Sequence, residues 1–228
     1  MTGVRQSARL GVFDLYYHSI RLVPANLAWG LGFAVLLSIV ALGAPLVALI
    51  GAPLLALPLV AIARLAGSLV REEDIVLSDA WHAARELARP ALVSGTLITI
   101  ATVVLGSNVQ LALLAGTASS LAMGVAAGWG LVALWLLALP FWVLLSDPVR
   151  AGRGSQAAAR EAAALLLVAP GRLLALAVLL SAVLLIGSVL VAAVLTVAVA
   201  YAALVTAHVV LPAADRLAGS RGSASLPD

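Results

Sequence analysis

The sequence predicts an all-α membrane protein: a polytopic helix bundle with six passes in three hairpins and amphipathic helices along its cytoplasmic face. Two observations lead to this prediction. The chain is 64% hydrophobic and only 10% charged, whereas about a quarter of the residues in soluble domains are charged. Its charged residues also leave three long stretches empty, at 22–63, 90–146 and 173–214. Long uncharged apolar segments are typical of helices that cross a bilayer.

The lengths of these stretches give the number of passes. They are 42, 57 and 42 residues long, and one helix needs about 20 residues to cross a hydrocarbon core of ~30 Å. Each stretch is therefore too long for one helix and long enough for two. Glycine, proline and polar residues mark the expected breaks at 43–45, 106–120 and 187–188. The predicted passes are 24–42, 45–64, 90–107, 121–145, 171–188 and 191–211. For 173–214 one long helix is the alternative, and two passes are favoured because a single helix would be about twice the bilayer core.

The arginines predict the orientation. All 13 basic residues are arginines, and they lie in the N-terminal segment, in the loops 64–89 and 147–172, and after Pro212. Loops rich in positive charge stay on the cytoplasmic side. We therefore expect a protein of the plasma (inner) membrane with both termini in the cytoplasm. Residues 1–214 form one integral membrane domain in this interpretation, and 215–228 form a short, disordered cytoplasmic tail.

Short amphipathic segments precede the three hairpins, and each ends near a proline: Pro24, Pro90 or Pro170. Proline is tolerated in the first turn of a helix, where its missing N–H has no partner in the helix. Each proline is therefore expected to begin a membrane helix. The preceding segments should lie along the inner membrane surface with their apolar face toward lipid. In the second segment, Ser78 is the expected N-cap and Asp79 lies in the first turn.

Several classes of function are excluded by composition. The chain has no cysteine and no lysine, so a thiolate nucleophile, a disulfide and a Schiff-base lysine are impossible. It has neither the HExxH nor the GxSxG motif, and only three histidines. We predict that the protein is not an enzyme and has no cofactor or metal site. The net charge of +3 reflects the positive-inside rule rather than a nucleic-acid partner. His208, the one histidine within a predicted pass, is a candidate for a proton relay, but a structural role is favoured, in which the side chain either snorkels to the inner interface or forms a hydrogen bond.

Polar residues on the third pass allow a second hypothesis. Thr96, Thr99 and Thr102 repeat every three residues, and Asn108 and Gln110 follow them. They could line a polar path for a small solute, which would make the protein a transporter or channel. Threonine in membrane helices also bonds back to its own helix, so a structural role is favoured.

Small residues recur every fourth position at Gly116, Ser120, Gly124 and Gly128. This spacing permits close approach of two helices in lipid. The partner is expected within the chain, while a second copy of the protein is the alternative.

Four segments carry a resemblance to a known family. They are FDLYYHSIRLVPANLAWGL, PLVAIARLAGSLVREEDIVLSDAWHAAREL, LPFWVLLSDPVRAG and APGRLLALAVLL. Together they resemble the YesL-like membrane proteins, a bacterial group built on a domain of unknown function, over about residues 10–212. In that family an aromatic residue typically follows the loop aspartate directly, whereas here Ala80 separates Asp79 from Trp81.

The resemblance implies a small polytopic protein whose genes often lie beside those of sugar ABC transporters. It therefore implies an accessory or assembly partner of a carbohydrate ABC importer, in contact with the permease or the ATPase subunits. The lipid bilayer is the other expected partner, and a scaffold that interacts with lipid is a third hypothesis. Arginine pairs in bidentate fashion with carboxylates and phosphates, so the residues expected to contact a partner are Asp79, Trp81, Arg85 and Arg89.

Overall fold

The described residues form helices joined by short turns. The structure is a computed structural model and describes residues 2–73, 76–189 and 194–223, and within these ranges it has no strand. The elements are α1 (Thr2–Tyr17), α2 (Ser19–Ala41), α3 (Pro45–Gly51), η1 (Ala52–Leu55), α4 (Ala56–Val70), α5 (Leu77–Glu86), α6 (Ala88–Ala115), α7 (Ala118–Ser146), η2 (Pro148–Arg150), α8 (Gly154–Val168), α9 (Pro170–Val189), the π-helical η3 (Val194–Ala198) and α11 (Val199–Ser223). The predicted all-α bundle is confirmed.

Five helical spans are long and apolar enough to cross a membrane, and a bent pair of helices gives a sixth candidate. The five are Ser19–Ala41, Pro45–Val70, Ala88–Ala115, Ala118–Ser146 and Thr196–Gly219. The bent pair is α8 and α9, which meet at an angle of 104°. The chain is therefore a multi-pass membrane protein, in which α8 lies across the direction of the span that follows it.

The first hairpin agrees with the sequence. Gly43 forms the turn with a φ of +82°, which lies in the left-handed region where glycine has no steric cost. The returning span runs from Pro45 to Val70 and includes the 3-10 turn η1. Pro53 lies in that turn, where its missing N–H locally prevents an α-helical hydrogen bond.

The second hairpin is longer than predicted. The turn lies within the predicted segment 106–120 but is much shorter than expected, because α6 continues to Ala115 and only Gly116 and Thr117 separate it from α7. The polar residue Asn108 donates a hydrogen bond to Val104 of its own helix at 2.8 Å and does not interrupt it. The helix ends where Gly116 adopts a φ of +64°.

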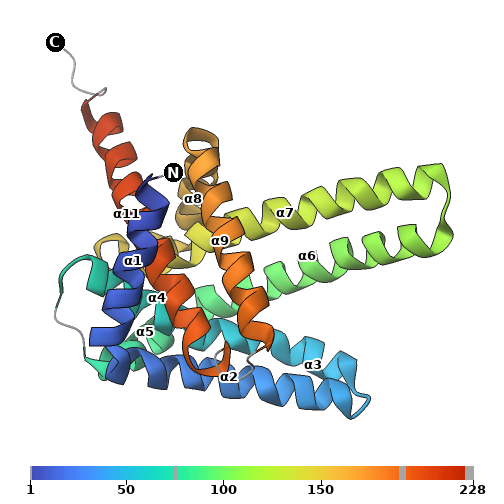
Figure 1. The fold of residues 1–228 in the computed structure, drawn as a ribbon, viewed down its shortest axis with the longest axis horizontal. Coiled ribbons are helices and arrows are strands. Elements are labelled where there is room, and N and C mark those ends of the chain that lie inside the picture. The colour runs from blue at the N-terminus through green and yellow to red at the C-terminus, as the bar shows by residue number, and fades with distance from the viewer. Residues whose placement is uncertain (1, 74–75, 190–193, 224–228) are drawn as a thin grey trace.

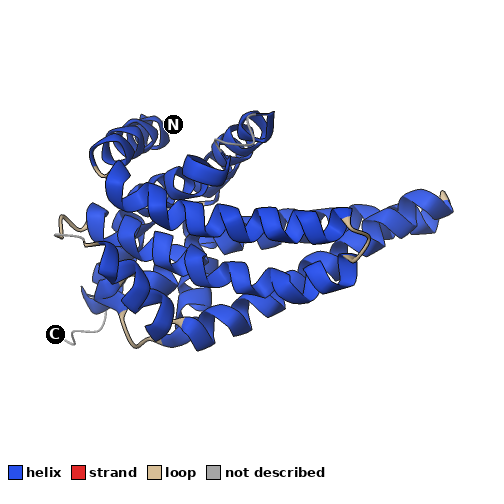
Figure 2. Ribbon diagram, turned by 90° about the horizontal axis from the view of Figure 1, so that it is seen from below, coloured by secondary structure: helices blue, strands red, loops and turns tan. Residues whose placement is uncertain are grey.

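The resulting arm of α6 and α7 projects well beyond the other helices in both ribbon views (Figures 1 and 2). The two helices contain 28 and 29 residues, so each is about 42 Å long at 1.5 Å per residue. This exceeds the ~30 Å hydrocarbon core, a mismatch that tilting of the helices accommodates.

Two predicted boundaries need correction. Pro24 does not begin a membrane helix, because α2 starts earlier, at Ser19, directly after a break at His18. Pro90 and Pro170 do lie in the first turns of α6 and α9. At the other end of the chain, α11 continues through Ser223, so the described part of the expected tail is helical. Residues 224–228 lie outside the described residues.

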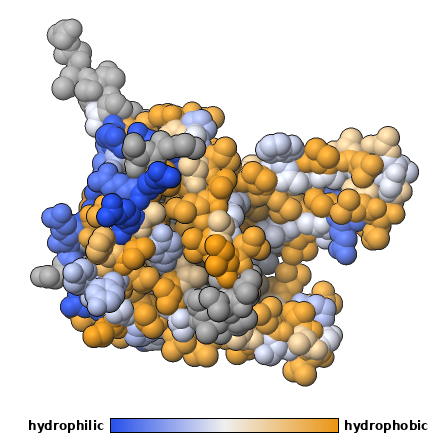
Figure 3. All heavy atoms as spheres, viewed as in Figure 1, coloured by the Kyte–Doolittle hydropathy of each residue, from blue (hydrophilic) through white to orange (hydrophobic). Residues whose placement is uncertain are grey.

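The core lies where α4, the last turns of α7, and α11 meet. Its fully buried side chains include Ile62, Leu65, Leu144, Leu204 and Leu211. Hydrophilic residues gather at one end of the molecule, near α1 and the end of α11, whereas apolar side chains cover the opposite arms (Figure 3). We call this the arginine-rich end; it comprises α1, α5, η2, the start of α8 and the last turns of α11.

A buried asparagine explains the π-helical segment that precedes α11. Asn26 is fully buried in α2, and its side-chain oxygen accepts a hydrogen bond of 2.7 Å from the backbone N–H of Ala200. A π-helical turn leaves a backbone group without its usual α-helical partner, and such a group must be satisfied when buried. Asn26 thus joins α2 to α11 across the bundle.

Gly124 is the small residue that the α6–α7 arm requires. A Cβ atom at this position would lie 2.5 Å from Cβ of Ala112, whereas a Cβ at Gly128 meets nothing within 4 Å. The expectation of an internal partner is therefore confirmed for Gly124, and Gly128 faces open space.

We expect Gly124→Ala to destabilise the arm, because the added methyl forces the two helices apart. Overpacking of this kind costs about 1–3 kcal/mol. Thermal unfolding in detergent micelles should show a lower midpoint for Gly124→Ala and little change for Gly128→Ala. The second substitution Ala112→Gly should restore the midpoint of Gly124→Ala. Equal midpoints for the two glycine variants would contradict the packing described here.

Candidate functional site

A cluster of five charged side chains joins the helices at the arginine-rich end. Its centre is Asp147, which directly follows α7 and has no exposed side-chain surface. Arg71, just after α4, donates to Asp147 at 2.8 Å. Arg150 in η2 also pairs with Asp147, and its own side chain is only 4% exposed. We refer to Arg71, Asp147, Arg150, Glu161 and Asp215 as the ion-pair cluster.

Two further carboxylates complete the cluster. Asp215 on α11 accepts hydrogen bonds from Arg71 at 2.6 Å and from Arg150 at 2.9 Å. Glu161 on α8 accepts from Arg150 Nε at 3.1 Å. The cluster therefore links α4, η2, α8 and α11, which are far apart in the sequence. It sets two positive charges against three negative ones.

The pKa shifts of Arg71 and Arg150 follow from their burial and from these hydrogen bonds. Burial alone lowers the pKa of Arg150, but its hydrogen bonds to Glu161, Asp147 and Asp215 outweigh that effect, and the pKa is raised. For Arg71, the hydrogen bonds to Asp215 and Asp147 raise the pKa. Among the described residues, no buried side-chain polar atom lacks a hydrogen-bond partner. Both guanidinium groups thus remain charged at this site.

A second long-range pair attaches α1. His208 on α11 lies 2.6 Å from Asp14 on α1, measured from Nε2 to Oδ2. Of the two structural roles expected for His208, the structure shows the hydrogen bond. On the same helix, Tyr16 and Tyr17 are exposed, as an apolar face turned toward lipid requires, while Asp14 on the polar face contacts the bundle.

Asp79 has a structural role in α5. Its carboxylate accepts a hydrogen bond of 2.8 Å from the backbone N–H of Val76, which satisfies a free donor at the start of the helix. The helix therefore begins at Leu77, and the prediction that Ser78 is the N-cap is wrong. The position of Asp79 in the first turn is confirmed.

The other partner-contact candidates lie on the outer edge of α5 and the start of α6. The side chain of Trp81 is 59% exposed, and the guanidinium carbon of Arg85 lies 4.9 Å from the centre of its ring. Arg89 is exposed in the first turn of α6. We call Trp81, Arg85 and Arg89 the α5 edge.

The inner face of α5 packs on the protein rather than on lipid. Ala80 and Ala83 are buried, and Ala84 and Leu87 pack against the core. The expectation that the apolar face of this segment turns toward lipid is therefore corrected for Ala84 and Leu87. Because the alanines allow α5 to approach α4 closely, Trp81 is left at the margin of the contact.

The five residues of the proposed polar path lie on α6. Thr96, Thr102 and Asn108 each donate to the carbonyl four residues earlier in that helix, at 2.8 Å. Thr96, Thr102 and Gln110 are exposed, and Thr99 is half-buried. These three hydrogen bonds lie within one helix, as the favoured structural role requires.

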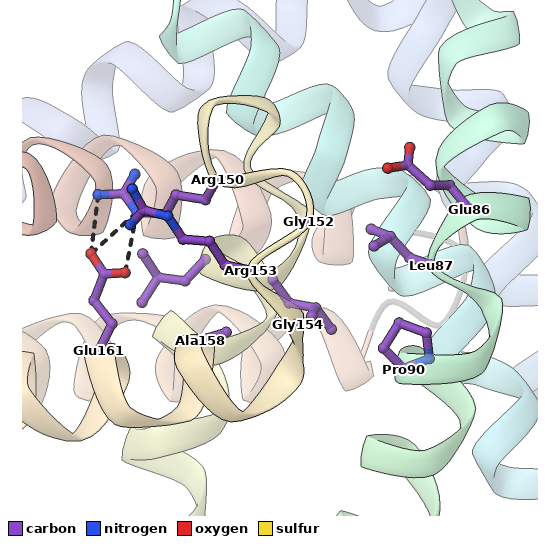
Figure 4. A pocket seen from close by; sticks show the side chains of 11 residues that line it. Glu86, Leu87, Pro90, Arg150, Gly152, Arg153, Gly154, Ala158 and Glu161 are labelled. Atoms are coloured by element: carbon purple, nitrogen blue, oxygen red, sulfur yellow. Dashed lines mark hydrogen bonds and ion pairs between the residues drawn. The ribbon is translucent and has the colours of Figure 1, made fainter.

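A cavity of about 200 Å³ separates the ion-pair cluster from the end of α5. Figure 4 shows Arg150 and Glu161 on one side of it, and Glu86, Leu87 and Pro90 on the other. Arg153 and the glycine loop before α8 close the remaining wall. Among the described residues, no three His, Asp or Glu side chains gather to hold a metal ion.

The ion-pair cluster was not predicted from the sequence. A signal for it is present: Asp147 directly ends a long apolar helix, and Arg150 follows after three residues in the segment SDPVR. An acid at that position must leave the membrane or find a partner. The sequence does not show that Arg71 and Asp215 are the other partners.

Comparison of the chain with protein-family models, curated proteins and solved structures gives no match.

We expect Asp147→Asn to destabilise the protein strongly, because two buried or half-buried arginines lose their shared carboxylate. Removing one partner of a buried ion pair costs about 3–5 kcal/mol. Chemical denaturation in detergent measures this loss.

The matched control is Glu73→Gln, the same chemical change at an exposed glutamate, which should leave stability within about 0.5 kcal/mol. Asp147→Asn combined with Arg150→Gln should cost less than the sum of the two single changes. Strictly additive losses would contradict a coupled cluster.

Proposed function

We propose that this protein is a non-enzymatic membrane accessory protein that binds a partner membrane protein through the α5 edge. The observation that carries the proposal is Trp81, which is largely exposed at a helix margin with the guanidinium of Arg85 over its ring. Tryptophan and arginine are the residues most enriched among those that dominate binding energy at protein interfaces. Stacking also pre-orders both side chains, which lowers the entropy lost on binding.

The packing and the polar contacts that hold α5 in place support this role. Ala80 and Ala83 fix α5 against the bundle, and Asp79 holds its first turn. Arg64 of α4 donates to the carbonyl of Ser146 at 3.0 Å and lies 3.9 Å from Glu86 at the end of α5. A surface held in this way is available to a partner without prior folding.

The class of partner comes from the resemblance to the YesL-like family, which favours a carbohydrate ABC importer. The permease or the ATPase would meet the α5 edge on the cytoplasmic side of the plasma membrane, where the arginine distribution places both termini. Arg85 and Arg89 would pair with carboxylates of that subunit, because arginine forms bidentate bonds to such groups.

Affinity purification of the tagged full-length protein from native membranes in mild detergent tests this function. Mass spectrometry should recover an importer permease or its ATPase in stoichiometric amount with the unaltered protein. Trp81→Ala should lower recovery about tenfold or more, since such anchors are worth about 2 kcal/mol or more. Arg85→Glu with Arg89→Glu should abolish recovery.

The control is Arg153→Glu with Arg160→Glu, an equal reversal of charge at two exposed arginines near and on α8. It should leave recovery unchanged. Retained binding by the Arg85 and Arg89 variant, or equal loss in the control, would refute docking at the α5 edge. Recovery of the protein alone from native membranes would refute the accessory function itself.

A further inference from the structure

A groove opens at the bend between α8 and α9. Its volume is about 780 Å³, which lies within the range of about 300–1,000 Å³ typical of ligand sites. Val4 of α1 and the end of α11 form the opposite wall. The apolar lining includes Leu165, Val168, Ala175 and Ala213.

Among the described residues, the charged side chains that line this groove are two arginines, Arg172 and Arg216. The acid nearest in sequence to Arg216 is Asp215, which is already paired with Arg71 and Arg150. Arg216 Nε donates to the carbonyl of Pro212 at 2.9 Å, which holds the side chain along α11. On α1, the exposed Arg5 directly follows Val4. The groove thus has an apolar wall and carries positively charged side chains.

The surrounding helices place the groove at the membrane interface. The 104° bend turns the chain from α8 into the apolar helix α9, and Arg172 is the third residue of that helix. Leu167 and Val168 just before the bend are 83% and 64% exposed. Arginines near the ends of apolar spans lie at the level of the lipid headgroups. Figure 1 shows α1, α8, α9 and the end of α11 on the same side of the molecule.

We propose that this groove binds an anionic phospholipid, with the phosphate between Arg172 and Arg216 and an acyl chain along the apolar wall. The charge complementarity favours an anionic headgroup over a zwitterionic one. The apolar lining favours a lipid over a free anion, because inorganic phosphate gains nothing from apolar contact. The inference does not depend on the α5 edge, whose residues do not line the groove.

The test uses the full-length protein in a neutral detergent, titrated with phosphatidylglycerol while the thermal unfolding midpoint is measured. A lipid that binds the folded state raises this midpoint. Phosphatidylglycerol should stabilise the unaltered protein at least tenfold more effectively, by concentration, than phosphatidylcholine. Inorganic phosphate at the same concentrations should have no effect, and an equal effect would overturn the lipid as occupant.

Arg172→Gln with Arg216→Gln should weaken the response to phosphatidylglycerol about 10- to 30-fold, since each arginine near an anionic surface contributes about fivefold to binding. The matched control, Arg153→Gln with Arg160→Gln, removes the same charge outside the groove and should respond as the unaltered protein does. Equal loss in both variants would show diffuse surface attraction and overturn the site.

A second variant keeps the test independent of those arginines. Ala175→Phe fills the apolar wall without changing charge, and it should also reduce the response to phosphatidylglycerol at least tenfold. Both variants should unfold at the unaltered midpoint in phosphatidylcholine, which reports that they are folded. An unchanged response of Ala175→Phe to phosphatidylglycerol would refute an acyl chain in the groove.

Discussion

The arrangement of helices at the arginine-rich end depends on the buried carboxylate of Asp147. Helices in lipid gain little from apolar burial, because lipid tails are as apolar as their side chains, so packing and polar contacts determine how they associate. Asp147 follows α7 and is paired with two arginines from other elements. A buried charge is tolerated only when its partners are held in place. The cluster therefore fixes α4, α8 and α11 relative to α7.

The same pairing determines which charges remain available at the surface. Among the described carboxylates, Asp147, Glu161 and Asp215 bind Arg71 and Arg150. Asp14, Asp79 and Glu86 contact His208, the backbone of Val76 and Arg64, respectively. Most acids are thus used within the protein. The arginines of the α5 edge and of the groove at α8–α9 lie outside this set of pairs, so each surface is positive although the net charge of the chain is only +3.

The sequence predicted the elements that depend on local chemistry. The charge-free stretches predicted the membrane spans, because a charge at mid-membrane is costly wherever it lies. Gly43 predicted the position of the first turn. The second turn was predicted too long because polar residues were taken to interrupt a helix. Asn108 bonds to its own helix instead, and only the left-handed Gly116 ends it. The start of α2 could not be inferred from Pro24, since a proline within a helix is tolerated in a membrane.

The candidate sites likewise differ in whether their residues lie close together or far apart in the sequence. The α5 edge could be proposed from the sequence because Trp81, Arg85 and Arg89 fall in one short segment. The cluster was missed because Arg71 and Asp215 are separated by 144 positions. Its arginines nevertheless explain a feature of the composition. Arg71 binds two carboxylates and Arg150 binds three, which suits a planar group with five fixed donors better than the compact ammonium of lysine. At these two positions, the use of arginine in a chain without lysine follows from geometry rather than from charge alone.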